Sequence, residues 1–250
     1  MYTHINNRKI HFKKCGSGKP LLLVHGWGGS LYSLHKLGHL ASKNYTTYLL
    51  DLPGFGKSDN PPKHWGVEGY ASVITDFIAD QHITKPHYFG HSFGGELGIF
   101  ITAHNPQMLG KLVLCNSAYK RKTKVSKVAQ LAKQAPQGTK FIINITKPLI
   151  KKLYYTFFHR DSDLMKYPHL EQNFRNIITQ DLTNEVKKIK NHTLIVWGEE
   201  DTYTPIHWAY ELEKNIRNAR IHVFPGAKHN LPIKDPQAVW DVMKGFLQYN

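Results

Sequence analysis

Short apolar runs recur along the chain and are separated by longer stretches with helical spacing. Each run has the length of a strand, and continuous apolar runs are typical of strands buried on both faces. The runs are Leu21–Val24, Thr47–Leu50, His87–Phe89, Leu112–Leu114, Thr193–Trp197 and Ile221–Phe224. The stretches between them are long enough for crossover helices, so the pattern predicts an α/β fold with a mostly parallel, doubly wound sheet.

Three of the intervening stretches have the apolar spacing of helices. They run from Val67 to Gln81, from Phe93 to His104, and from Pro236 to Leu247. The first carries an apolar stripe made by Tyr70, Ile74, Phe77 and Ile78. The second ends where Asn105-Pro106 stops a helix, because proline cannot continue the hydrogen-bond ladder.

The alternation of runs and helices breaks down between residues 118 and 190. This segment holds 16 Lys and Arg against 5 Asp and Glu, which is +11 of the formal net charge of +15. Its apolar positions recur with helical spacing, and Pro136, Pro148 and Pro168 divide it into short helices. We therefore predict a helical insertion over 118–190 in one core domain formed by residues 1–117 and 191–250.

Composition places the 250-residue chain among ordinary globular proteins, with 41% hydrophobic and 20% charged residues. Met1 to Asn7 lacks the apolar stretch of a secretory signal, and no apolar run approaches the ~18 residues of a membrane span. We expect a soluble cytoplasmic protein without a membrane span. The two cysteines, Cys15 and Cys115, have no paired spacing and are interpreted as reduced thiols.

Ser92 lies in the segment Gly90-His91-Ser92-Phe93-Gly94, between a predicted strand and a predicted helix. A serine on such a sharp turn has its hydroxyl projected outward, and small residues on either side let the strand and the helix pass closely. The N–H groups that open the helix stabilise negative charge near the serine. The pattern indicates a nucleophilic serine.

The same pattern resembles the α/β-hydrolase superfamily, as a serine hydrolase of the carboxylesterase type with a helical cap. The segment His25-Gly26-Trp27-Gly28-Gly29 is similar to the oxyanion loop of that family. The resemblance implies that the backbone N–H groups of Trp27 and Phe93 bind the oxyanion, and that Trp27 contacts the substrate. For His25 we favour a packing role, and for the turn Asp51–Ser58 a structural one.

A nucleophilic serine needs a histidine to take its proton and a carboxylate to orient that histidine. In the family the order is nucleophile, acid, histidine. The segment Gly198-Glu199-Glu200-Asp201-Thr202-Tyr203-Thr204-Pro205 resembles its acid loop, and we predict Asp201 as the acid, with Glu199 and Glu200 as alternatives. The base is predicted to be His229, which follows the last predicted strand. We expect His222 to be packed in that strand or exposed at its edge.

The resemblance implies a carboxylic-ester hydrolase (class EC 3.1.1) that acts on a small acyl substrate through a Ser92–His229–Asp201 triad. It needs no cofactor, and the chain has no metal-ligand motif. Hydrolysis of thioesters, lactones, amides or activated carbon–carbon bonds stays open, because the same machinery serves all of them and the pocket decides. The rival from another class is a binding or receptor-like protein that keeps the fold without turnover.

The basic insertion admits three further interpretations. It can present a solvated lysine-rich face, which we favour, or attract an anionic substrate or an acidic carrier protein. Nucleic-acid binding rests on charge alone and lacks a recognition motif. The apolar side chains of the insertion either line the substrate pocket or pack on the core. They include Phe141, Leu149, Tyr154, Phe157 and Phe158.

Overall fold

The computed structural model describes residues 1–120 and 166–248, in which eight strands form one sheet of order β1-β2-β4-β3-β5-β6-β7-β8. The strands β3 to β8 run parallel to one another, whereas β1 and β2 add an antiparallel edge. The strands are β1 Tyr2–Ile5, β2 Arg8–Cys15, β3 Pro20–Val24, β4 Thr46–Leu50, β5 His87–His91, β6 Leu112–Cys115, β7 Thr193–Gly198 and β8 Ala219–Phe224.

The register of the parallel strands aligns their carboxyl ends. Val24 of β3 pairs with Gly90, Gly90 with Leu114, Leu114 with Ile195, and Ile195 with Ile221. The loops that follow β3, β5, β6, β7 and β8 therefore meet at one edge of the sheet. This is the edge at which ligands bind in open α/β sheets.

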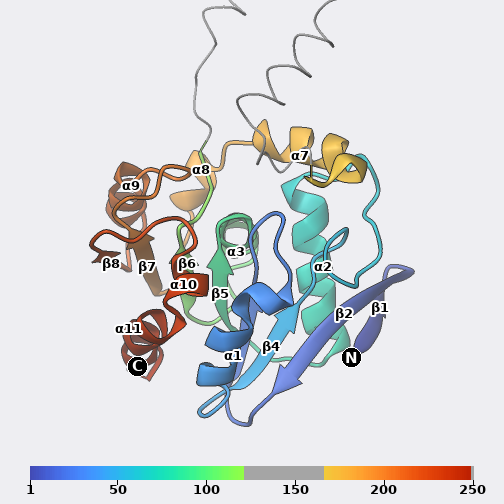
Figure 1. Ribbon diagram of the computed structural model, residues 1–250, viewed down its shortest axis with the longest axis horizontal. Helices are drawn as coiled ribbons and strands as arrows, with labels where there is room; N and C mark the ends of the chain where they lie inside the picture. The colour runs from blue at the N-terminus through green and yellow to red at the C-terminus, as the bar shows by residue number, and fades with distance from the viewer. Residues whose placement is uncertain (121–165, 249–250) are drawn as a thin grey trace, which may run out of the picture.

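Helices cover both faces of the sheet (Figure 1). Leu21 and Leu23 of β3 join one core with α1 and α11, whereas Leu22 and Val24 join the other with α2, α3 and α9. This alternation follows from the two-residue period of a strand. The helices are η1 Leu31–Leu34, α1 His35–Ala41, α2 Val67–Asp80, α3 Phe93–His104, η2 Pro168–Leu170, α7 Glu171–Ile178, α8 Thr183–Val186, α9 His207–Asn215, α10 Leu231–Lys234 and α11 Pro236–Gln248.

The predicted fold class is confirmed, since each strand and helix predicted outside residues 118–190 lies within two residues of an observed one. The stripe of α2 is buried as its spacing predicts. One expectation about burial was wrong: β8 is not buried on both faces, because among the described strands it pairs with β7 alone, and it exposes Arg220 and His222. The antiparallel strands β1 and β2 were not predicted, since Arg8–Cys15 mixes charged and apolar residues without a continuous apolar run.

The segment between β6 and β7 contains η2, α7 and α8 in its described part, and Pro168 is the first residue of η2. Figure 1 shows α7 across the top of the molecule, above α2 and α3. Residues 121–165, including the predicted lining positions Phe141 to Phe158, lie outside the described residues. The boundaries 118–190 of a separate cap therefore stay a prediction. Among the described helices, none is long and apolar enough to cross a membrane.

Candidate active site

Ser92 lies between β5 and α3 in an unusual backbone conformation. Its φ of 51° and ψ of −112° are sterically unfavourable for a residue with a side chain. Hydrogen bonds hold the turn: the Ser92 N–H donates to the Cys115 carbonyl at 2.9 Å, and the Ser92 carbonyl accepts from Gly95 at 3.0 Å. The surrounding backbone therefore fixes the strained turn, and the Ser92 hydroxyl lies against His229 at the cavity.

Glycine is required on both sides of this turn. A Cβ at position 90 would lie 2.4 Å from the Gly94 carbonyl oxygen, and a Cβ at position 94 would lie 2.3 Å from that of Val24. Both obstacles are backbone atoms, which cannot rotate out of the way. The close passage of β3, β5 and α3 thus depends on these two glycines.

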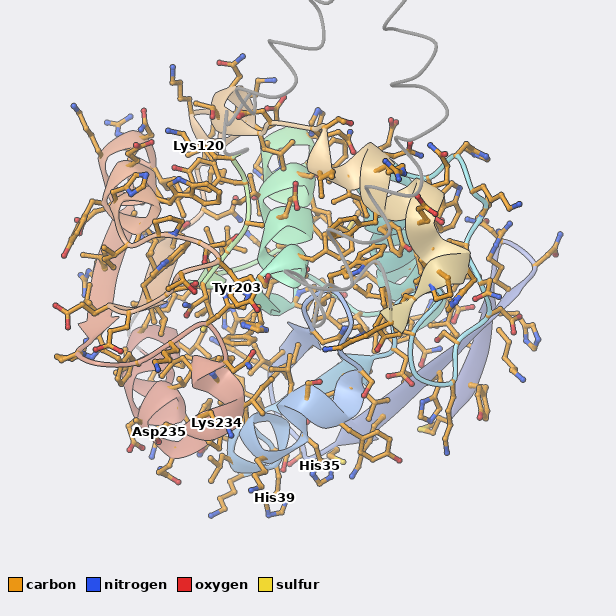
Figure 2. The ribbon with its side chains drawn as sticks, turned by 45° about the horizontal axis from the view of Figure 1, so that its top comes forward. His35, His39, Lys120, Tyr203, Lys234 and Asp235 are labelled. Atoms are coloured by element: carbon orange, nitrogen blue, oxygen red, sulfur yellow. The ribbon has the colours of Figure 1, made fainter. Side chains whose placement is uncertain are left out.

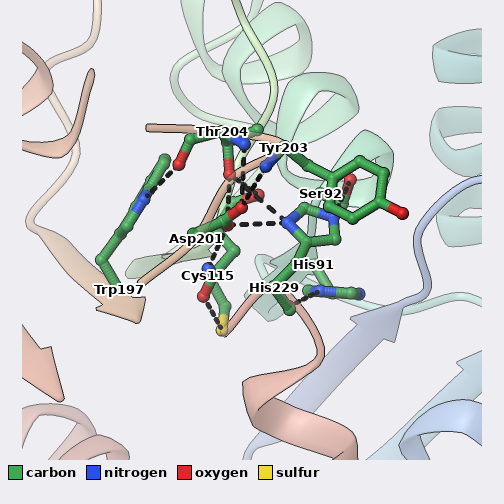
Figure 3. A network of polar contacts seen from close by, with 9 residues as sticks. His91, Ser92, Cys115, Trp197, Asp201, Tyr203, Thr204 and His229 are labelled. Atoms are coloured by element: carbon green, nitrogen blue, oxygen red, sulfur yellow. Dashed lines mark hydrogen bonds and ion pairs between the residues drawn. The ribbon is translucent and has the colours of Figure 1, made fainter. Parts of the chain in front are cut away.

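Three side chains from three loops form a continuous hydrogen-bonded chain (Figure 3). The Nε2 atom of His229 lies 3.0 Å from the Ser92 hydroxyl, and its Nδ1 atom lies 2.7 Å from a carboxylate oxygen of Asp201. Ser92 follows β5, Asp201 follows β7, and His229 follows β8. The aligned carboxyl ends of these strands bring together residues that are 28 to 137 positions apart in sequence.

The Asp201 carboxylate is buried and receives four further hydrogen bonds. One oxygen accepts from the backbone N–H groups of Tyr203 at 2.8 Å and Thr204 at 2.9 Å. The other accepts from the Thr204 hydroxyl at 2.6 Å and from the Asn116 amide. Burial by itself raises the pKa of Asp201, but the bonds from His229, Asn116 and Thr204 outweigh it and lower the pKa below its ordinary value. Asp201 is therefore held as an anion oriented toward His229.

His91 supports the loop that carries His229. Its ring is 5% exposed, and its Nε2–H donates to the His229 carbonyl at 2.9 Å. Burial, together with the nearby His229, lowers the pKa of His91 to about 3. The ring is neutral near pH 7 and acts as a hydrogen-bond donor to the backbone.

The loop after β3 brings Trp27 to the start of α3. The Trp27 ring packs edge-on against Phe93 with centroids 5.6 Å apart, and the loop carbonyl of Gly28 accepts from the Tyr167 hydroxyl at 2.7 Å. Phe93 is the first residue of α3, so its N–H has no partner within the helix. Trp27 and Phe93 both line the same cavity as Ser92.

This cavity has a volume of about 490 Å³, which suits a small organic molecule. Its wall is mainly apolar on the side formed by Phe174, Ile177 and Trp208, and it also includes Lys120 and Tyr203. Figure 2 turns the top of the molecule toward the viewer and labels these last two residues. Lys120 forms an ion pair with Glu211 of α9.

The other residues considered from sequence lie elsewhere or pack structurally. Glu199 and Glu200 are exposed, and Glu199 accepts from the Gly226 N–H at 3.3 Å. His25 is buried, donates to the Gly26 carbonyl at 2.8 Å and accepts from the Leu52 N–H at 3.0 Å. These bonds match the packing role that we favoured for it.

Asp51 is a buried structural carboxylate. It accepts hydrogen bonds from the N–H groups of Leu31 and Lys57 and contacts the ring of His11 at 2.7 Å. Cys15 and Cys115 are free thiols. Over residues 1–120 and 166–248, no group of three His, Cys, Asp or Glu side chains forms a metal site.

Asn116, Thr204 and His91 contact the candidate triad but were not singled out from the sequence. Asn116 directly follows the apolar run of β6, so a polar residue at the carboxyl end of a buried strand was the available signal. Thr204 lies in the predicted acid loop, and His91 lies beside Ser92 in the glycine turn. Their partners follow only from the three-dimensional meeting of the loops.

The parallel sheet and the Ser92–His229–Asp201 hydrogen-bonded chain can now be compared with known protein families. Residues 19–236 match the family model described as the alpha/beta hydrolase fold, so the chain belongs to the α/β-hydrolase family. It is a hydrolase.

Sequence comparison also gives a relative that matches most of the chain. It is 27% identical over 245 residues to the 2-hydroxy-6-oxononadienedioate/2-hydroxy-6-oxononatrienedioate hydrolase of Escherichia coli O139:H28, covering 88% of this chain and 84% of the relative.

Two solved structures show the same fold. The enol-lactonase from Burkholderia xenovorans LB400 is 20% identical, with a TM-score of 0.78 and 100% of each chain covered. The meta-cleavage product hydrolase from Pseudomonas fluorescens IP01 is 23% identical, with a TM-score of 0.75 and 99% of this chain and 97% of the other covered.

Proposed function

We propose that this chain hydrolyses a carboxylic ester, or a related activated acyl compound, through an acyl-enzyme formed on Ser92. The observation that carries the proposal is the hydrogen-bonded chain from Ser92 through His229 to Asp201, with Ser92 and His229 opening onto the cavity. A hydroxyl is a poor nucleophile near pH 7 unless a base takes its proton as it attacks.

The residues have separate roles in the proposed reaction. The Ser92 oxygen attacks the acyl carbon while its proton passes to Nε2 of His229, and the buried anion of Asp201 stabilises the resulting imidazolium. The N–H groups of Trp27 and Phe93 bind the oxyanion. His229 then gives its proton to the leaving group. Water, activated by the same histidine, hydrolyses the acyl-enzyme and frees Ser92.

Labelling with a serine-reactive fluorophosphonate tests the nucleophile and also the rival of a non-catalytic binding protein. We expect stoichiometric labelling of the wild type and none of Ser92→Ala. Ser42→Ala is the matched control, because Ser42 is a half-buried serine at the end of α1 whose hydroxyl donates to the His39 carbonyl and which lies outside the cavity of Ser92. An unlabelled wild type, or equal labelling of Ser92→Ala, would refute the proposal.

Turnover supplies the second test. With p-nitrophenyl esters of increasing acyl length, Ser92→Ala is expected to lose at least about 10⁴-fold in kcat, as happens when a member of such a triad is removed. Residual activity within tenfold of the wild type would assign the reaction to another group.

A carbon–carbon bond hydrolase is the second candidate. It is favoured by the match over most of both chains to the Escherichia coli hydrolase, whose name specifies a 2-hydroxy-6-oxo dienedioate. Assaying that compound and the p-nitrophenyl esters on one preparation separates the two: a kcat/KM at least about tenfold higher for the dienedioate favours the second candidate. Ser92→Ala is expected to lose whichever activity dominates.

An anionic substrate or an acidic carrier protein stays a prediction, because most of the basic insertion lies outside the described residues. Lys120 and Lys166 line the cavity, but the charge of Lys120 is compensated by Glu211. A carrier-bound ester is therefore expected to react no faster than its free analogue, and an activity on it that is higher and falls with salt would favour the carrier.

A further inference from the structure

A second cavity, of about 560 Å³, lies at the amino ends of the parallel strands, whereas Ser92 lies at their carboxyl ends. The amino ends of four neighbouring parallel strands meet there: Lys19 precedes β3, His87 begins β5, Lys111 precedes β6, and His192 precedes β7. Five residue steps of about 3.3 Å separate His87, which lines this cavity, from Ser92, so the two lie about 16 Å apart along β5. It is separate from the candidate active site.

The lining of this cavity is strongly basic. Four lysines contribute to it, namely Lys19, Lys85, Lys111 and Lys190, together with His87 and His192. No Asp or Glu is among the described residues that line it. Lys19, Lys85 and Lys190 are exposed, so their ammonium groups reach the solvent at its mouth. Like charges from four separate segments thus converge on one concave surface.

The electrostatics of Lys111 and His87 show that these charges act on one another. Burial lowers the pKa of Lys111, and the neighbouring Lys19 and Arg220 lower it further. Burial, Lys111 and Lys19 lower the pKa of His87 to about 4. His87 accepts a hydrogen bond from the Lys111 N–H at 3.0 Å, and the Lys111 ammonium donates to the Phe246 carbonyl at 2.9 Å. Hydrogen bonds therefore hold His87 and Lys111 in place on the inner wall of the pocket, where the neighbouring lysines create a positive potential.

We propose that this basic pocket binds a small anion that carries two or more phosphate groups. Lysine binds phosphate as a point charge, and several lysines around one concavity match several phosphate groups better than one planar carboxylate. The volume suits a small molecule. A single-stranded nucleic acid is disfavoured, because no Phe, Tyr or Trp among the described residues lines the pocket to stack on a base.

Isothermal titration calorimetry of the whole chain with pyrophosphate at low ionic strength tests the proposal. We expect saturable binding of one pyrophosphate, weakened by salt and tighter than that of orthophosphate. The double variant Lys19→Gln and Lys190→Gln is expected to bind at least about tenfold more weakly, since it removes two exposed charges and keeps most of each side-chain stem.

Lys36→Gln combined with Lys63→Gln is the matched control, because it removes the same net charge from exposed positions away from this pocket. It should bind pyrophosphate within about twofold of the wild type. Equal weakening in both double variants would show that the net charge alone attracts the anion, and it would overturn the proposal, as would no measurable heat with the wild type.

The outcome is independent of the proposed hydrolysis. Neither Lys19 nor Lys190 lines the cavity of Ser92, so the pocket variant should keep the wild-type rate on p-nitrophenyl esters and an unchanged circular dichroism spectrum. If the spectrum changes, the single variant Lys85→Gln replaces the double variant, because it alters a different exposed lysine of the pocket. Lys85→Gln is expected to bind pyrophosphate at least about threefold more weakly than the wild type.

Discussion

Replacement of His91 by glutamine tests how a buried neutral imidazole makes stability depend on pH. In the native state the ring is 5% exposed, and its pKa is lowered to about 3, chiefly by burial and then by His229. In the unfolded chain the ring titrates near pH 6.5. Between these two values the unfolded state binds one more proton than the native state.

The sign and the size of the effect follow from this difference. Because the unfolded state binds more protons, the free energy of unfolding falls as the pH is lowered below 6.5. At pH 5 the native ring is still neutral, so the loss is 1.5 pH units at about 1.36 kcal/mol each, or about 2 kcal/mol. Glutamine does not titrate, and its amide can donate to the His229 carbonyl in place of the ring.

Urea unfolding at pH 7 and pH 5, followed by tryptophan fluorescence, measures the effect. The difference in free energy of unfolding between His91→Gln and the wild type should move by about 2 kcal/mol in favour of the variant on going to pH 5. His222→Gln serves as control, because it removes an exposed histidine from β8. If His91→Gln and the wild type keep the same difference at both pH values, the buried neutral ring is not a source of acid sensitivity.

Three further predictions concern glycines and the candidate acid. Gly94→Ala should lower the free energy of unfolding by about 2 kcal/mol or more, because the new methyl group would lie 2.3 Å from the Val24 carbonyl oxygen; an unchanged urea midpoint would contradict the close passage. Gly245→Ala in α11 should raise it by about 0.5–1 kcal/mol, since no described residue beyond the adjoining helix backbone lies within 4 Å of the new methyl group, and a lower melting temperature would count against this. Thr204→Val removes the hydroxyl that donates to Asp201 at 2.6 Å and should lower kcat about tenfold with little change in KM. Thr204→Ser should restore the rate, and failure to do so would assign the loss to packing.

Much of the fold was predictable because the central strands are continuous apolar runs, as in Leu21–Val24, and because α2 buries one regular stripe. β1 escaped prediction because it is only four residues long and mostly exposed, and β2 because its lysines interrupt the apolar positions of the strand. Ser92, Asp201 and His229 could be selected from the sequence because each lies in a motif and the motifs occur in the order of the family. Asn116 could not, because it meets Asp201 only through the neighbouring positions of β6 and β7 in the sheet. A contact between two loops depends on the strand order, which local sequence patterns do not contain.

The position of β8 at the edge of the sheet bears on how the protein ages. Within residues 1–120 and 166–248 this strand pairs with β7 on one side and with no strand on the other, and the loop that it leads into carries His229. Fraying of an edge strand needs far less free energy than opening the sheet. A preparation can therefore lose the alignment of His229 with Ser92 while its circular dichroism spectrum stays that of a folded protein. Its functional half-life would then measure the local opening of β8, and stabilising mutations in the two central cores would lengthen it very little.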